Sequence, residues 1–386
     1  MLAAVKKEAL RLEYLDGLRA VASLYVVLFH AGVGFNSGPL TGVAHLFWHT
    51  LVFGHDAVAI FIVLSGYCLM LPVARAEGQL VRGLQSYFAR RAWRILPPYY
   101  ATVLGSLLLL ALVPVLETPT TTIWADTFPA FGLAPIGSHL LLIHNLYRNL
   151  ANRIDGPLWS VATEWQIYVF FPVLLLPIWR RFGAALTVLV GFALGSSLLW
   201  LAPEAAQSAA SWYLGLFALG MAAAGIGFAS RPLERAMRER VPWGALSLLL
   251  LTFVAVGASV LIKFWFDHIP LSDALVGATT AVSLVYLTKH ALKPASPSRP
   301  ISLRVLESAA LVAVGRFSYS LYLTHLPVVA LLYFGLRRLA LSANAQMLAL
   351  SVLSVPASVL FSYAFFWVFE RRFTGHPAAF FGKRAS

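Results

Sequence analysis

Charged residues are scarce in this sequence, because Asp, Glu, Lys and Arg make up only 12% of its 386 residues. A soluble domain usually carries about 25%. Hydrophobic residues make up 59% of the chain, and the mean hydropathy is +0.77. A water-soluble core could not bury this much apolar surface. The scarcity of charge therefore excludes a soluble globular protein and predicts that lipid surrounds most of the chain.

Cysteine is almost absent, since Cys68 is the single one. One cysteine excludes an internal disulfide framework and a zinc site built from cysteines. Low-complexity segments, internal repeats and a separate soluble portion are also missing from the sequence. We therefore expect a single membrane-embedded domain over residues 1–386, and nothing in the sequence requires a metal.

Apolar stretches of about 20 residues recur along the chain, and each is long enough to cross a bilayer as a helix. The predicted fold is an all-α integral membrane protein. The first stretch is expected to be an uncleaved helix, because Arg19 interrupts it and it is long enough to span. Ten transmembrane helices are predicted, at residues 15–34, 54–73, 97–116, 158–178, 183–202, 211–229, 243–262, 271–288, 315–335 and 346–369.

The net charge of +13 is unevenly distributed between these predicted helices. If the N-terminus is cytoplasmic, the cytoplasmic segments hold 22 of the 29 Lys and Arg, and the outer segments hold five. Positive charge collects on the cytoplasmic side of membrane proteins. The pattern predicts that both termini are cytoplasmic, and it explains the basic composition without a nucleic-acid partner.

The first predicted helix, "LDGLRAVASLYVVLFH", carries three ionisable residues. Arg19 and His30 are eleven residues apart, which places them on one helix face with a separation of roughly 16 Å. Asp16 precedes Arg19 by three positions and can pair with it. Arg19 could simply reach lipid headgroups, and His30 could hydrogen-bond within the bundle. Ionisable groups inside membrane helices usually mark a site, so we favour an anion-binding end at Arg19 and a base at His30.

The segment "YFARRAWRILPPYY" (87–100) is basic and amphipathic, and we expect Pro97 and Pro98 to end it before the third span. Its arginines, Arg90, Arg91 and Arg94, could bind anionic lipid headgroups. They could instead form a clamp for a phosphate ligand, since Arg recognises phosphate bidentately.

Other polar residues enter the predicted helices further along the chain. Glu164 lies about one and a half turns inside the fourth span, where we expect it to orient His30 as the carboxylate of a hydrolase triad does. His55 and Asp56 are expected to be solvated at the outer end of the second span. Further candidates for substrate binding, several of which could equally serve packing, are Ser65, Asn145, Trp159, Tyr168, Tyr319 and His325.

Five segments together resemble acyltransferase family 3, the membrane O-acyltransferases of bacteria. In chain order they are "LDGLRAVASLYVVLFH", "IFIVLSGY", "FARRAWRILPPYY", "WSVATEWQIYVFFP" and "FSYSLYLTHLPV". The resemblance implies a multi-pass protein of the bacterial inner (plasma) membrane. It also implies transfer of an acyl group, most often acetyl, from cytoplasmic acyl-CoA to a hydroxyl of a saccharide, such as a lipopolysaccharide or glycolipid, at the outer side.

The resemblance also assigns roles to residues. His30 matches the essential histidine of the family, and Arg19 matches the arginine paired with it. Arg90, Arg91 and Arg94 match the arginines implicated in acyl-CoA use. Glu164 matches the first carboxylate of a Trp-Ser-x-x-x-Glu-Glu pattern, in which Trp165 replaces the second.

The ionisable residues and the family resemblance together predict one mechanism. The CoA phosphates dock on the arginines, the pantetheine arm follows the face between Arg19 and His30, and His30 acts as general base with Glu164 beside it. A covalent acyl-histidine relay is the variant. The rival interpretations are a secondary transporter or flippase with a proton path, and a membrane sensor without catalysis. Dependence on CoA separates the enzyme from both.

Overall fold

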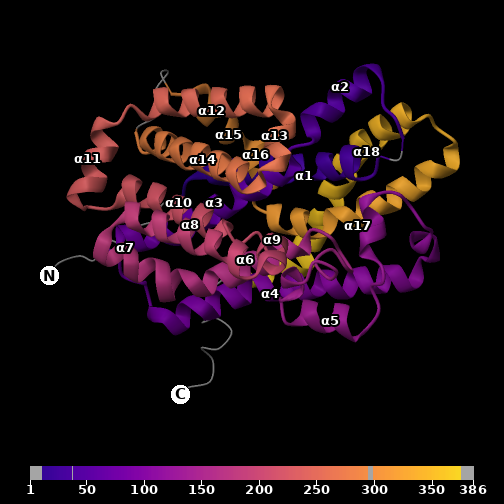
Figure 1. The fold of residues 1–386 in the computed structure, drawn as a ribbon, viewed down its shortest axis with the longest axis horizontal. Coiled ribbons are helices and arrows are strands. Elements are labelled where there is room, and N and C mark those ends of the chain that lie inside the picture. The colour runs from indigo at the N-terminus through magenta and orange to yellow at the C-terminus, as the bar shows by residue number, and fades with distance from the viewer. Residues whose placement is uncertain (1–10, 37, 294–298, 375–386) are drawn as a thin grey trace.

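A computed structural model describes residues 11–36, 38–293 and 299–374 of the chain, and these residues form helices without any β-strand among them. Many of the long helices run along the longest axis of the molecule (Figure 1). The α-helices are α1 Glu13–Phe29, α2 Gly42–Leu51, α3 Gly54–Arg75, α4 Gly83–Leu112, α5 Leu133–Leu140, α6 Leu158–Phe170, α7 Leu176–Phe182, α8 Ala184–Leu201, α9 Pro203–Ser208, α10 Tyr213–Phe228, α11 Pro232–Arg240, α12 Trp243–Val260, α13 Ile262–Asp267, α14 Ile269–Ala291, α15 Ile301–Leu306, α16 Ala309–Gly315, α17 Ser318–Leu336 and α18 Ala343–Phe365. Short π-helical or 3-10 segments connect or extend them, and they are η1 His30–Gly34, η2 Pro114–Glu117, η3 Ile123–Thr127, η4 His144–Leu146, η5 Phe171–Leu175, η6 Arg337–Leu339, η7 Phe366–Glu370 and η8 Arg371–Phe373.

Nine helical stretches within the described residues are long and apolar enough to cross a membrane. A tenth is counted if α10 and α11, which meet at a bend of 83°, form one span. The prediction of an all-helical membrane protein with about ten spans is confirmed. Nine of the ten predicted ranges agree with a helical stretch to within a few residues, because length and apolar composition alone set a span.

The third predicted span is the exception, because α4 begins at Gly83 and runs through both prolines to Leu112. The prediction that Pro97 and Pro98 end the basic segment is therefore wrong. Membrane helices tolerate proline where neighbouring groups satisfy the backbone. Next to these prolines, the Tyr319 hydroxyl of α17 donates to the Ile95 carbonyl at 3.0 Å, which ties this part of α4 to its neighbour. The arginines of α4 consequently belong to the same helix as the third span.

The centre of the bundle is built by close helix contacts at glycines. A Cβ atom placed on Gly66 of α3 would lie 2.0 Å from the Phe217 carbonyl oxygen of α10. A Cβ atom on Gly220 of α10 would lie 2.0 Å from the Val63 carbonyl oxygen. Small residues let membrane helices approach backbone to backbone, and the contact between α3 and α10 is of this kind.

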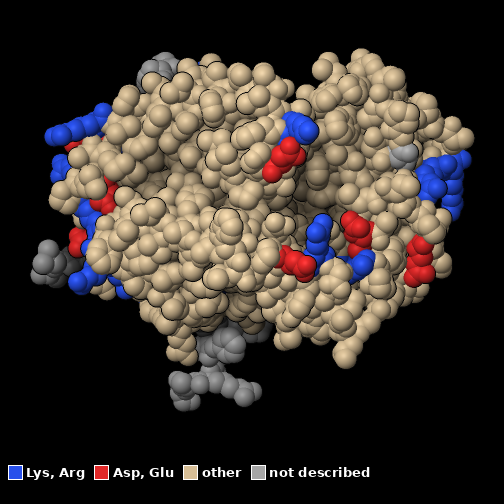
Figure 2. Space-filling model, viewed as in Figure 1, with Lys and Arg blue, Asp and Glu red and all other residues tan. Residues whose placement is uncertain are grey.

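The surface view separates charge from apolar area. Lys and Arg gather at the two ends of the long axis, a few charged residues lie between them at the centre and on the right, and a broad uncharged area covers much of the rest of this face (Figure 2). Large apolar side chains such as Trp200, Leu112 and Val352 are exposed. An uncharged belt with exposed apolar side chains is what a lipid-facing surface requires.

Candidate active site

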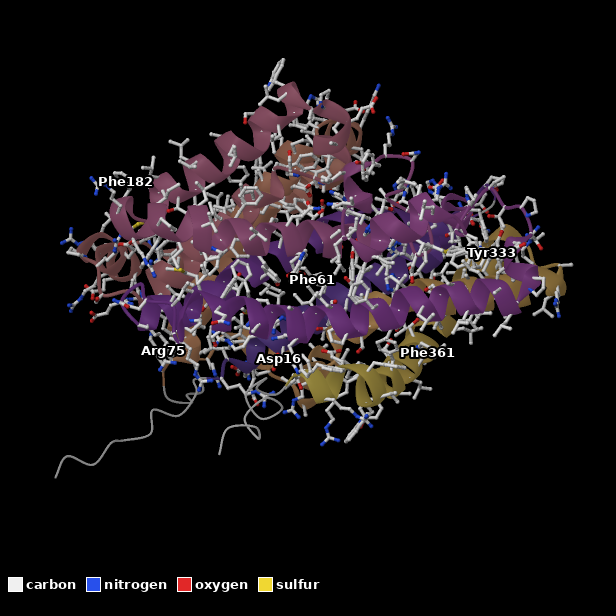
Figure 3. All side chains as sticks on the ribbon, turned by 90° about the horizontal axis from the view of Figure 1, so that it is seen from below. Asp16, Phe61, Arg75, Phe182, Tyr333 and Phe361 are labelled. Carbon is white, nitrogen blue, oxygen red and sulfur yellow. The ribbon has the colours of Figure 1, made fainter. Side chains whose placement is uncertain are left out.

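A cavity opens among α1, α3, α4, α6 and α17, with about 870 Å³ of space including its open part, and we name it the inner cavity because Arg91 and Arg94 in its wall belong to a segment predicted to be cytoplasmic. Phe61 of this cavity lies near the middle of the molecule, with Arg75 toward one end and Tyr333 toward the other (Figure 3). The polar lining side chains are Arg19, Ser65, Cys68, Arg91, Arg94, Ser160, Glu164, Tyr168, Ser318, Tyr319 and Tyr322.

Three of the four predicted arginines meet in this cavity. Arg19 donates to Asp16 at 3.3 Å and contacts the Cys68 sulfur at 2.9 Å. Arg91 and Arg94 reach the cavity from neighbouring turns of α4, and the Nε atom of Arg91 is buried without a hydrogen-bond partner among the described residues. Three guanidinium groups that line one cavity have the charge and the donors that binding of a large anion requires.

Arg90 does not join the other arginines. Its guanidinium donates to the Ser86 hydroxyl and, at 3.1 Å, to the Val81 carbonyl. It is also absent from the lining of the cavity. The three arginines that were predicted to act together are therefore separated, with Arg91 and Arg94 in the cavity and Arg90 outside its lining.

Glu164 lies in the same cavity, where it accepts hydrogen bonds from Ser65 and from the Tyr168 hydroxyl, the latter at 2.5 Å. The predicted contact with His30 is absent, because the hydrogen bonds described for Glu164 go to these two hydroxyls and His30 opens into another cavity.

The cavity into which His30 opens is named the outer cavity. It holds about 690 Å³ of space, including its open part, and lies beside the inner one. Val58 and Tyr322 line both cavities, so a single layer of side chains separates them. Its polar and aromatic lining side chains are Phe29, His30, His55, Asp126, Asn152, Trp159 and Tyr322.

His30 is held by a second histidine. Its Nδ1 atom lies 2.9 Å from the Val26 carbonyl and 3.1 Å from Nε2 of His325. Nδ1 of His325 in turn lies 2.8 Å from the Tyr322 carbonyl. A carbonyl only accepts, so in the neutral state both rings carry their proton on Nδ1, and His325 accepts from His30. The lone pair of His30 is then on Nε2, which has no hydrogen-bond partner among the described residues.

The local backbone helps to aim His30. The α-helix ends at Phe29, and a π-helical turn, η1, begins at His30 itself. Such turns redirect side chains and recur at functional sites. The sequence marked both histidines as candidates, but their contact across the bundle was not predicted.

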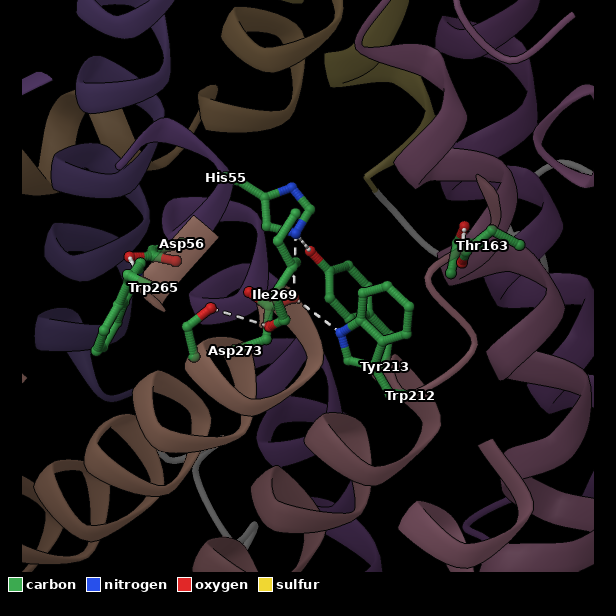
Figure 4. A network of polar contacts seen from close by, with 10 residues as sticks. His55, Asp56, Thr163, Trp212, Tyr213, Trp265, Ile269 and Asp273 are labelled. Atoms are coloured by element: carbon green, nitrogen blue, oxygen red, sulfur yellow. Dashed lines mark hydrogen bonds and ion pairs between the residues drawn. The ribbon is translucent and has the colours of Figure 1, made fainter. Parts of the chain in front are cut away.

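A second histidine of the outer cavity is held by a carboxylate (Figure 4). Nε2 of His55 lies 3.0 Å from Oδ2 of Asp273 and 3.1 Å from the Tyr213 hydroxyl. The same Asp273 oxygen accepts from the Trp212 indole at 2.8 Å. Asp273 is fully buried.

Two expectations about this end of α3 are therefore corrected. His55 is bonded to Asp273 rather than simply solvated, and Asp56 accepts from the Trp265 indole at 3.1 Å. Asp273 was missed by the sequence reasoning. Its signal was a carboxylate only a few residues inside an apolar span, in "PLSDALVG".

The remaining predicted residues fall into different places. Trp159 lines the outer cavity with its ring parallel to His55, at 6.0 Å between centroids. Tyr319 lines the inner cavity. Asp16 pairs with Arg11 and Arg19 outside the lining of both cavities.

Asn145 lies outside both cavities. It bonds to Thr163 and Gln166, which ties the loop before α6 to that helix. The described contacts thus give Asn145 a structural role.

Comparisons with known proteins agree with one another. The family model described as an acyltransferase domain matches residues 12–367. A protein of Staphylococcus aureus strain COL, provisionally named an O-acetyltransferase, is 28% identical over 170 residues, or 42% of this chain and 24% of that protein. A protein of Bacillus subtilis strain 168, provisionally named a peptidoglycan O-acetyltransferase, is 27% identical over 165 residues, or 42% of this chain and 23% of its own. The chain thus spans about a quarter of the length of these relatives. No solved structure matches.

Proposed function

Since the chain belongs to the acyltransferase family that matches residues 12–367, we propose that it transfers an acyl group from acyl-CoA to a hydroxyl of a saccharide or glycolipid. Acetyl-CoA is the proposed donor, taken from the cytoplasm, and the acceptor is reached at the outer side of the bacterial inner membrane. The observation that carries this proposal is the pair of cavities, one lined by arginines and one by His30, which share Val58 and Tyr322.

The inner cavity suits the donor. Guanidinium groups bind phosphate oxygens in pairs, and Arg19, Arg91 and Arg94 supply three of them for the phosphates of CoA. Beyond the arginines the wall includes apolar side chains such as Phe61 and Ile62, which suit a thioester arm. The donor would therefore extend from the arginines toward Tyr322.

The outer cavity suits the reaction with an acceptor. Nε2 of His30 can accept the proton of a hydroxyl as a general base. The same lone pair can instead attack the thioester and hold the acyl group itself. In either case His325 stabilises the charge that forms on the ring, because it accepts the Nδ1 hydrogen of His30 at 3.1 Å.

The test is label transfer from acetyl-CoA in inverted and right-side-out membrane vesicles. Wild type should place label on a saccharide when acetyl-CoA reaches the cytoplasmic face, and His30→Ala should lose at least about 100-fold of the rate. His268→Ala, which changes an exposed histidine outside both cavities, is the matched control and should keep the wild-type rate.

Two results would contradict the proposal. One is full activity of a folded His30→Ala protein. The other is proton-dependent uptake that needs no CoA, which would favour the secondary transporter and make Arg19 and His30 parts of a proton path.

A further inference from the structure

The outer cavity contains a second imidazole, and this one has a carboxylate partner. His55 is at the start of α3, and Asp273 lies on α14. Trp212 and Tyr213, at the start of α10, complete the contacts. Three helices thus fix the position of one ring that lines the same cavity as His30.

The hydrogen bonds also fix which nitrogen of His55 is free. A carboxylate oxygen only accepts, so Nε2 of His55 carries the proton that is shared with Asp273. In the neutral ring Nδ1 then holds the lone pair, and it has no hydrogen-bond partner among the described residues. In Figure 4 the nitrogen without dashed lines points away from Asp273. The side chain is 33% exposed, so this lone pair is open to a ligand.

The two histidines therefore differ in chemistry. Within the described part of the chain His30 is bonded to the Val26 carbonyl and to His325 but to no carboxylate, and Glu164 is bonded to Ser65 and Tyr168 in the other cavity. His55 has the arrangement that strengthens an imidazole as a base, since a buried carboxylate fixes its tautomer and stabilises its protonated form. A nucleophile and a separate base in one cavity suit a transfer in two half-reactions.

Resting on the proposed function, we propose that His30 carries the acyl group and that His55, positioned by Asp273, is the base that deprotonates the acceptor hydroxyl. In the first half-reaction Nε2 of His30 attacks the thioester, so that a C–N bond forms and the C–S bond breaks. CoA leaves as a thiolate, which takes a proton from water on the donor side. The Nδ1 proton of the acylated ring passes to Nε2 of His325, 3.1 Å away.

The second half-reaction uses the other histidine. The acceptor oxygen attacks the acyl carbon as its proton passes to Nδ1 of His55, so that a C–O bond forms and the C–N bond breaks. His30 recovers its Nδ1 proton from His325. His55 then gives the acceptor proton to water in the outer cavity, and both rings return to their starting state.

The experiment separates the two half-reactions in purified full-length protein. The first assay follows the first half-reaction, as exchange of label from radioactive CoA into acetyl-CoA in the absence of an acceptor. The second assay measures transfer of the acetyl group to methyl glucoside, N-acetylglucosamine oligomers or digested peptidoglycan. Hydrolysis of acetyl-CoA is counted as transfer to water. His55→Gln should lose about 100-fold or more of the transfer rate, as expected for loss of a general base, while exchange continues. Asp273→Asn should show the same split with a smaller loss, and His30→Ala should lose both activities.

Asp56→Asn is the matched control, because Asp56 also binds a tryptophan indole at this end of the bundle but does not line the cavity. It should retain both activities. Continued exchange also reports that the His55 variant is folded.

Three outcomes would overturn the inference. They are normal transfer by His55→Gln, loss of exchange in a His55→Gln protein that still binds CoA, and wild-type transfer without any exchange. A wild type that uses no acyl-CoA in either assay would instead overturn the proposed function.

Discussion

At the scale of single residues, neighbouring arginines of one helix have different surroundings. Arg91 and Arg94 line the inner cavity, whereas Arg90 is bonded to Ser86 and the Val81 carbonyl. We expect Arg91→Ala and Arg94→Ala to raise KM for acetyl-CoA by about 10- to 100-fold, because each removes a charge-assisted contact to phosphate. Steady-state kinetics at varied acetyl-CoA check this, with Arg90→Ala as the control that should change KM little. Equal changes in KM for all three variants would contradict the separation of Arg90 from Arg91 and Arg94.

A buried carboxyl outside the spans predicts how stability depends on pH. Burial raises the pKa of Asp155 to about 8, although the hydrogen bond from Ser106 works against the rise. The folded protein therefore favours the protonated carboxyl, whereas the unfolded chain ionises near its ordinary pKa of about 4. Stability should fall as the pH rises from about 4 to about 8.

Thermal unfolding in detergent at several pH values measures this effect. The midpoint of wild type should fall across that range, and Asp155→Asn should flatten the fall. Asp267→Asn, which changes an exposed carboxylate, should show the same dependence of the unfolding midpoint on pH as wild type. An unchanged slope in Asp155→Asn would show that the carboxyl is not responsible.

At the scale of helices, the sequence predicted the spans well and their neighbours poorly. Apolar length is a local property, so nine ranges could be located without knowing the fold. Contacts between helices depend on the whole bundle, and no local pattern encodes them. For that reason Glu164 was placed beside His30 and is instead bonded to Ser65 and Tyr168.

The same reasoning accounts for the other differences. His30 and His325 were both singled out, yet their contact joins residues 295 positions apart. The contact of Asp273 with His55 joins residues 218 positions apart, so no local pattern could predict it. The prediction that the prolines end the basic segment used a rule for soluble helices. Inside a membrane, neighbouring helices can satisfy the backbone, and α4 continues through both prolines.

The glycine contact between α3 and α10 gives a prediction at this scale. Gly66→Ala would push a methyl group into the Phe217 carbonyl, so the helices must separate. Overpacking of this kind costs about 1–3 kcal/mol, and the thermal midpoint should fall by several degrees. Gly105→Ala in α4 is the matched control, since a Cβ atom there meets nothing within 4 Å. Equal midpoints for the two variants would contradict the close approach.

At the scale of the whole molecule, the charge distribution predicts the orientation in the membrane. Lys263 belongs to a predicted outer segment and Arg181 to a predicted cytoplasmic one. In a Cys68→Ala background, a membrane-impermeant maleimide should label Lys263→Cys in spheroplasts but not Arg181→Cys. Labelling of Arg181→Cys should appear only after the membrane is opened. The reverse pattern would invert the topology and, with it, the side from which the donor enters.

The thin wall between the two cavities has an electrical consequence. An energised membrane holds its voltage and proton gradient only while every embedded protein insulates. Here cavities from the two halves of the molecule approach each other until Val58 and Tyr322 line both. In the proposed reaction those side chains would let an acyl group pass and still block ions, which would make Tyr322 an electrical seal as well as a wall of the site. A smaller residue at that position would then let ions leak across the membrane.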